Sequence, residues 1–419
     1  MKRILFFLIL LFPFVAAFPN EYKDPVTNVV YTFDPIGNTA QVKPGVEEID
    51  IDSRSYSGLD MNYHDGLIYP GSPEAKTAIV ILDRFAVDGK EYKVEKIGDY
   101  AFANMRNIMS VTIPSSVKSI GCMAFFGCDV LSDVVLNEGL TSIGEMAFAG
   151  CESLSTISFP ESLLEIESRA FQKCVKLESV FIPANIIRLG TMSFYCCYAL
   201  SKIQVAESNS VFDSRDNCNA IIETATNKLL MGCKETEIPA TVTLIDDMAF
   251  VSCKGLKSIN VPQSVEEIGV SAFEDCTDLI NISLSEGLKT IKSGAFYGAG
   301  LSSITIPSSV LSIGTGAFSS PAIRTITSLI MNPFEVQYIC LQQKKVTLRV
   351  PIGTKSIYET TSGWNDFRAI EEIQPSGIRT ITLQTTLHSF FDLQGRRIQG
   401  SPKHGVYVQN GKKVMKLGN

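Results

Sequence analysis

A six-residue phrase, I-G-x-x-A-F, recurs in nine near-copies along this chain of 419 residues. Its first residue moves forward in steps of 23, 23, 23, 23, 56, 23, 23 and 22. A fixed period of this size is typical of a solenoid, in which each repeat is one coil that buries its apolar face on its neighbours. The copies begin at Ile97, Ile120, Ile143, Ile166, Leu189, Ile245, Ile268, Ile291 and Ile313.

Each repeat also carries a unit of the form I-x-I-P. Its alternation with period two predicts a short strand with one face turned inward. Proline has no backbone N–H for the next ladder bond, so the strand should end there. Stacked coils would bring equivalent strands about 4.8 Å apart. The repeats therefore predict a mainly β fold, a solenoid of about nine 23-residue repeats with a parallel strand ladder.

Stacking should also place equivalent side chains above one another. The phenylalanine of the phrase is expected to form one continuous buried column of Phe102, Phe125, Phe148, Phe171, Phe194, Phe250, Phe273, Phe296 and Phe318. Three residues further on, a second column holds Cys128, Cys151, Cys174, Cys197, Cys253 and Cys276. Met105 and Ala299 fill the same place in other repeats, so we interpret this column as apolar core with free thiols.

The full pattern, L-x-x-I-x-I-P-x-S-V-x-x-I-G-x-x-A-F-x-x-C, resembles the BspA-like class of bacterial leucine-rich repeats. The stretch from Ile113 to Cys128 shows most of it, and the resemblance covers about residues 96–330. It implies a leucine-rich-repeat fold. Because proteins of this class are associated with adhesion to host or neighbouring cells, it also implies a binding role, although the scaffold does not define the ligand.

The repeat is interrupted at the step of 56. The extra stretch, residues 209–234, has two apolar runs around a polar turn and predicts an inserted β-hairpin that projects from the solenoid. Such an insertion can carry function or be a tolerated decoration. Its flanking residues Cys218 and Cys233 could form a disulfide or remain unpaired thiols.

Solenoid ends expose core and need caps. Residues 18–95 lack the repeat but alternate in places, so a small antiparallel β cap is expected there. Residues 331–374 contain the only tryptophan, Trp364, and resemble the closing unit of BspA-like arrays, where a short helix covers the last repeat. We interpret Trp364 as a core plug and not as a platform for a ligand.

The two ends of the chain suggest export. Residues 1–17 have a positive start, an apolar run too short to span a bilayer, and small residues before Phe18, as in a secretory signal peptide. Residues 375–419 begin with Pro-Ser-Gly, and from Gly377 they hold seven basic residues and one acid. This tail is similar to the final part of type IX secretion sorting domains, which implies the outer surface of a Gram-negative bacterium. Its Asn410-Gly411 pair is also an ordinary hairpin turn.

Composition and motifs offer little support for catalysis. The net charge of −7, with an acidic body before the basic tail, disfavours nucleic acid as a partner. The three histidines are scattered outside the repeats, and no nucleophile motif, phosphate loop or zinc-ligand spacing is present. We therefore expect no enzymatic activity, no catalytic residue, no metal and no cofactor.

The outward positions of the strands form a polar, short-chained face. Such side chains lose little entropy when covered, which suits a broad contact surface, although serine and threonine also simply fill strand surface well. Phe181 is the large apolar exception, and aromatic residues are favoured as binding anchors. We expect an extracellular protein to bind here; a glycan, or a structural envelope role without a ligand, is the alternative. The candidate residues are Thr156, Ser158, Ser179, Phe181, Lys202 and Gln204.

Overall fold

The structure is a computed structural model that describes residues 20–23, 29–34, 39–42, 77–373, 390–391, 397–398, 405–409 and 412–416. The chain forms two compact units, residues 1–372 and 373–419, which are treated separately. The expected signal peptide, residues 1–17, lies outside the described residues, as do the three histidines.

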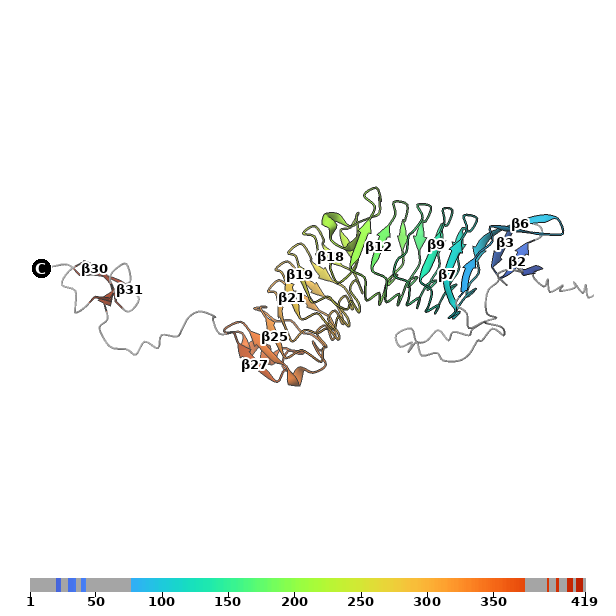
Figure 1. The fold of residues 1–419 in the computed structure, drawn as a ribbon. Coiled ribbons are helices and arrows are strands. Elements are labelled where there is room, and N and C mark those ends of the chain that lie inside the picture. Colours follow the sequence, from blue (N-terminus) through green and yellow to red (C-terminus); the bar gives the residue numbers. More distant parts are fainter. Residues whose placement is uncertain are drawn as a thin grey trace, which may run out of the picture. The chain divides into compact units, whose positions relative to one another are not determined.

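The first unit is a mainly β solenoid of about 12 turns with a spacing of about 23 residues (Figure 1). The I-x-I-P units form the predicted parallel ladder, which is divided into four sheets, and within a sheet neighbouring coils are in register: Ser110 pairs with Asp133 and Ser179 with Lys202. Its strands are β4 (Thr77–Val80), β7 (Ile108–Ile113), β9 (Asp133–Leu136), β12 (Ser179–Ile182), β14 (Lys202–Val205), β19 (Ser258–Val261), β21 (Asn281–Leu284), β23 (Ser303–Ile306), β25 (Thr325–Ser328), β26 (Thr347–Val350) and β27 (Ala369–Glu372).

A second parallel ladder, which the sequence did not predict, runs through short strands at the start of each phrase; all of them except β6 have two residues. The isoleucine of each strand points into the core and the preceding residue points outward, as Ser142 and Ile143 show. Before the insertion its strands are β6 (Lys90–Ile97), β8 (Ser119–Ile120), β10 (Ser142–Ile143), β11 (Glu165–Ile166) and β13 (Arg188–Leu189). After it they are β18 (Leu244–Ile245), β20 (Glu267–Ile268), β22 (Thr290–Ile291) and β24 (Ser312–Ile313).

The phenylalanine rings are buried and stack nearly parallel, but in two columns. Centroids lie 5.0, 5.0, 5.3 and 5.4 Å apart from Phe102 to Phe194, and 4.9, 5.3 and 5.5 Å apart from Phe250 to Phe318. The prediction of one continuous column is wrong between Phe194 and Phe250, because the inserted segment adds a coil that has no phenylalanine at the column position. Gly232 lies there instead, and a Cβ on it would be only 2.1 Å from the Phe250 ring.

The inserted segment does form a hairpin, with β16 (Ala220–Glu223) antiparallel to β17 (Lys228–Gly232), and β15 (Phe212–Asp213) pairs with β16. A short 3-10 turn, η1 (Arg215–Asn217), connects β15 to β16. The hairpin does not project from the solenoid as predicted, because β17 pairs in parallel with β18 and continues the second ladder. Both faces of β16 are apolar, so exposing the hairpin would leave one face uncovered.

Strand β16 separates two hydrophobic cores. Ile221 packs in the first core, with the coils before the insertion, whereas Ala220 and Ile222 pack in the second, with the coils after it. All three side chains are fully buried. The insertion is therefore a shared wall between two stacks of coils.

Both ends of the first unit are capped. At the N-terminal end β1 (Asn20–Lys23), β2 (Val30–Asp34) and β3 (Thr39–Val42) are antiparallel to each other, and β5 (Arg84–Val87) is antiparallel to β6. Strand β3, however, pairs in parallel with β6, so the cap is a mixed sheet and not the purely antiparallel one expected. Joining β3 to the parallel ladder in this way covers the first coil.

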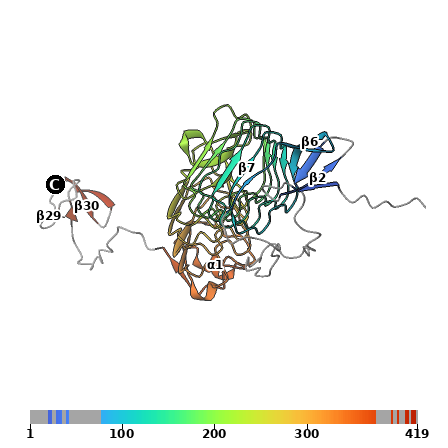
Figure 2. The ribbon, with the colours of Figure 1, turned by 45° about the vertical axis from the view of Figure 1, so that its right-hand side comes forward.

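The C-terminal cap contains η2 (Gln343–Lys345) and α1 (Lys355–Thr360), which lies at the end of the coils (Figure 2). Trp364 is fully buried beside it, and its ring meets Tyr358 edge-on at 5.1 Å. The indole Nε1 donates a hydrogen bond to the Phe334 carbonyl at 2.8 Å. Trp364 thus packs as the plug that the sequence suggested.

The second unit is a small antiparallel sheet of four strands in the order β29-β28-β30-β31. Its strands are β28 (Phe390–Phe391), β29 (Arg397–Ile398), β30 (Gly405–Gln409) and β31 (Lys412–Lys416). Gln409 pairs with Lys412. The hairpin turn expected at Asn410-Gly411 lies outside the described residues.

Candidate functional site

The six candidate residues gather on the outer surface of three consecutive coils. Ser179 pairs with Lys202 and Phe181 with Gln204 in the β12–β14 ladder. Val180 and Ile182 alternate with them and point into the core, which turns Phe181 outward with 48% of its surface exposed. We call these six residues the Phe181 face: Thr156, Ser158, Ser179, Phe181, Lys202 and Gln204.

Thr156 and Ser158 are exposed in the coil before β12, where the backbone forms no regular strand. The coils still join there, because the Glu178 N–H donates to the Ser155 carbonyl at 3.1 Å. Ser158 therefore takes the position equivalent to Phe181, one coil earlier. The structure brings the predicted residues together, although one of the three coils lacks the expected strand.

Two further apolar side chains lie in the same column as Phe181. Val80 pairs with Thr112, and Thr112 pairs with Val135, at the positions equivalent to Phe181 in earlier coils. Val80 is 55% exposed and Val135 41% exposed. Large apolar groups thus recur at every second coil, about 10 Å apart. The sequence columns contained Val135, but Val80 was missed because its coil lacks the I-G-x-x-A-F phrase.

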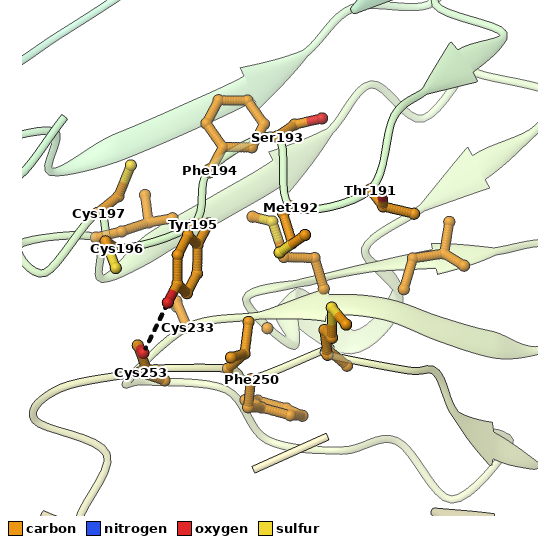
Figure 3. Close-up of a pocket in the computed structure, with 18 of the residues that line it drawn as sticks. Thr191, Met192, Ser193, Phe194, Tyr195, Cys196, Cys197, Cys233, Phe250 and Cys253 are labelled. Atoms are coloured by element: carbon orange, nitrogen blue, oxygen red, sulfur yellow. Dashed lines mark hydrogen bonds between the residues drawn. The ribbon is translucent and has the colours of Figure 1, made fainter. Parts of the chain in front are cut away.

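A cavity of about 110 Å³ lies where the insertion interrupts the phenylalanine column (Figure 3). Tyr195, Cys196 and Cys197 approach it from one coil, and Cys233, Phe250 and Cys253 from the coils beyond. The Ser252 hydroxyl donates to the Tyr195 hydroxyl at 3.4 Å, and burial raises the pKa of Tyr195. The cavity is well below the roughly 300–1,000 Å³ of ligand pockets. We interpret it as a packing gap at the wall between the two cores.

All eleven cysteines lie within the described residues and are free thiols. In five column members Sγ donates to a phenylalanine carbonyl of the preceding coil, at distances from 3.0 to 3.4 Å. Cys253 follows the inserted coil, which has no such phenylalanine. Cys218 and Cys233 are buried and unpaired, and their thiols face the carbonyls of Ala220 and Asn219.

The six column thiols should resist alkylation in the folded protein and react fully once it is unfolded. The thiolate is the reactive form, and burial raises the pKa of Cys128 and of Cys276 to about 12. Iodoacetamide labelling followed by mass spectrometry measures each site. Cys122 and the column member Cys253 are both partly exposed. Because burial raises the pKa of Cys122 only to about 11, it should react faster than the column. Bridges between cysteines of neighbouring repeats would overturn the assignment.

The same thiols give the fold a pH dependence with a defined sign. In the unfolded chain they ionise near the ordinary pKa of 9.0, whereas burial holds Cys128 neutral up to about 12. The unfolded state therefore loses protons first as the pH rises. Their contribution to stability is fully present below about pH 9 and is lost as the pH rises toward 12.

Two kinds of feature are absent from the part of the chain that the structure describes, a metal-ligand cluster and a membrane-spanning helix. Over these residues no three His, Cys, Asp or Glu side chains are grouped so that they could hold a metal ion. No described helix is long and apolar enough to cross a membrane.

Comparisons with known proteins identify the coils. A family model described as the BspA type leucine rich repeat region matches six copies, over residues 95–222 and 220–325. The structure is similar to the pneumococcal vaccine antigen PcpA, with 20% identity and a TM-score of 0.58 over 85% of this chain and 99% of that one. A leucine-rich repeat protein from Bacteroides ovatus gives 20% identity and a TM-score of 0.52 over 84% and 77%. Among curated proteins none matches this sequence.

Proposed function

Because this chain belongs to the BspA-type leucine-rich repeat family, we propose that it is an exported binding protein whose Phe181 face holds an extracellular partner protein. One observation carries the proposal. Phe181 is a half-exposed aromatic ring at the centre of a polar surface of short side chains. Burying apolar surface on a partner contributes about 25 cal/mol per Å² before the costs of association.

The surroundings of Phe181 suit a protein partner. Serine and threonine lose little side-chain entropy on being covered. Val80 and Val135 extend the apolar contact along the ladder, and aromatic anchors dominate the energy of many interfaces. Glycan sites use aromatic platforms, and among the described strand residues of this face Phe181 is the only aromatic side chain. A protein is therefore the favoured partner over a glycan or a purely structural role.

The proposed location is the outer surface of a Gram-negative bacterium. Residues 1–17 have the features of a signal peptide, and the tail after Pro375 is similar to sorting domains. PcpA, which has the same fold, is a vaccine antigen, and an exposed location for this chain is in keeping with that description. A partner outside the cell would then meet the strand face directly.

Phe181→Ala should weaken partner binding by about 2 kcal/mol or more, which is about thirtyfold in Kd. The substitution removes the anchor ring without touching the core, because the ring points away from it. The full mature chain would first be screened against purified extracellular matrix proteins and a glycan array. Kd values for the strongest protein hit would then be measured by biolayer interferometry.

The matched control is Leu311→Ala, which removes a 69%-exposed apolar side chain outside the Phe181 face. Its Kd should stay within about twofold of the unaltered protein. Undiminished binding by Phe181→Ala would exclude this face as the site. Binding on the glycan array alone would replace the protein partner with a carbohydrate.

Deleting residues 377–419 should leave the melting temperature of the solenoid almost unchanged and alter where the protein is found. The tail strands pair only with one another among the described residues, so no ladder of the solenoid loses a partner. Thermal unfolding of the purified variant and cell fractionation of the producing bacterium measure the two effects.

The second readout separates the possible roles of the tail. A large fall in melting temperature would make the tail a cap of the solenoid. Normal stability together with unchanged location would leave it without a sorting role.

A further inference from the structure

A groove of about 510 Å³ lies on the second ladder, beside the insertion. This volume falls within the range of binding pockets. Its walls come from three coils before the insertion and from the inserted segment itself. We call it the Glu167 groove. Its principal lining residues are Glu145, Glu167, Ile187, Val211, Glu223 and Leu230.

The groove exists because the second ladder is interrupted at this point. Phe212 follows Leu189 by one repeat of 23 residues, so β15 is positioned to be the next rung after β13. Instead β15 pairs antiparallel with β16. In the described sheets β13 is the last strand of one and β15 the first strand of the next. Both line the groove, and β13 offers an unpaired strand edge to it. The Phe212 N–H of β15 already donates to Asn209 Oδ1 at 2.9 Å.

The inner surface of the groove is partly apolar. Ile187 has 53% of its surface exposed. Leu189, Val211 and Leu230 are partly buried against the first core and line the same groove. An occupant with an aliphatic side chain would cover these groups, and removing them from water would contribute favourably to the free energy of binding.

The charge of the groove is strongly one-sided. Four glutamates line it, Glu145, Glu165, Glu167 and Glu223, against one cation, Arg188. Arg188 is held by Glu165 at 2.7 Å. No ion pair within the described residues reaches the other three carboxylates. A cationic occupant is therefore complementary to the groove, whereas an acidic one is repelled.

One of these carboxylates is fixed in place. The Glu145 N–H donates a hydrogen bond to Glu167 Oε2 at 3.0 Å, which joins two coils through the side chain. Because the Glu167 carboxylate is already oriented, an incoming lysine or arginine finds a placed acceptor and less side-chain entropy is lost on binding.

We propose that the Glu167 groove binds an extended peptide segment of a partner protein in which basic and aliphatic residues alternate. The peptide backbone adds to the free edge of β13, as in other cases of strand addition. Alternate side chains then point the same way, so that one set meets the carboxylates and the other meets Ile187 and Leu230. This surface is separate from the Phe181 face, which lies on the first ladder.

The test uses the full mature chain and a fluorescein-labelled seven-residue peptide of alternating lysine and leucine, followed by fluorescence anisotropy. Binding should weaken as salt rises, because exposed charges are screened. Three matched peptides test the separate contributions. Alternating glutamate and leucine reverses the charge, and alternating lysine and serine removes the apolar side chains. Alternating lysine and leucine with N-methyl groups on alternate amides removes backbone donors. Each should bind at least about tenfold more weakly than the lysine–leucine peptide.

Variants of the protein then locate the site. The double variant Glu145→Gln/Glu167→Gln and the single variant Ile187→Ser should each raise Kd about tenfold. The control Glu152→Gln/Glu207→Gln removes two exposed acids outside the groove, and Phe181→Ala alters the other face; both should bind as the unaltered protein does. Equal binding of the N-methylated or lysine–serine peptide would reduce the effect to nonspecific charge attraction and overturn the proposal. Unaltered binding by the groove variants would overturn it as well.

Discussion

Phe171→Ala should lower the free energy of unfolding by about 3–5 kcal/mol. The Phe171 ring is fully buried and lies between Phe148 at 5.3 Å and Phe194 at 5.4 Å, with Phe159 meeting it edge-on at 5.5 Å. Its removal leaves a cavity in the middle of the column. The coil backbones hold the rings on either side in place, so these rings cannot close the cavity. Urea unfolding followed by circular dichroism gives the change.

Phe181→Ala is the matched control, since it makes the same chemical change ten residues away on the exposed side of a strand. Its cost should be below about 1 kcal/mol, because the ring is half in water already. A cost for Phe171→Ala as small as that of the control would show that the phenylalanine column does not carry the packing that its geometry indicates.

Trp364→Ala should cost a similar amount, about 3–5 kcal/mol, at the other end of the solenoid. The substitution empties the site of the largest fully buried side chain and removes the edge contact with Tyr358. It also leaves the partly buried Phe334 carbonyl without its indole donor, which adds part of the cost of an unpaired acceptor. Urea unfolding again measures the total.

The part of the solenoid that Trp364→Ala destabilises is as informative as the size of the change in unfolding free energy. Trp364 belongs to the second core, so hydrogen exchange should accelerate in the coils of Phe250 to Phe318 and much less in those of Phe102 to Phe194. Trp364→Phe keeps a ring in the cap and should cost clearly less. Equal acceleration of exchange in both stacks would mean that the two cores unfold as one.

Most of the fold could be predicted because the repeat is regular. The spacing of the phrase fixes which residues stack, and the alternation in Ser179–Ile182 correctly identifies Phe181 as outward. The second ladder was missed because a two-residue strand such as Ser142–Ile143 is too short to show a period of two. The parallel pairing of these strands depends on the stacked coils and not on local propensity.

The insertion shows where a sequence pattern stops being sufficient. Two apolar runs around a turn correctly predicted the hairpin, but they do not show that β17 would join a ladder. Gly232 gave no signal, although it occupies the place where a phenylalanine ring would otherwise stack. The Glu167 groove could not be predicted from the sequence for the same reason. Its residues come from several coils and the insertion, over positions 145–230, and only the break in the ladder brings them together.

Strand β16 also bears on how a chain of this kind can change its length. Its opposite faces close the stack before it, through Ile221, and the stack after it, through Ile222. Each stack therefore ends on a finished surface, with its own cap at the far end of the chain. Duplication or loss of whole 23-residue units can lengthen or shorten either stack while the hairpin stays intact. The lengths of the two stacks can therefore evolve separately on the two sides of a fixed junction.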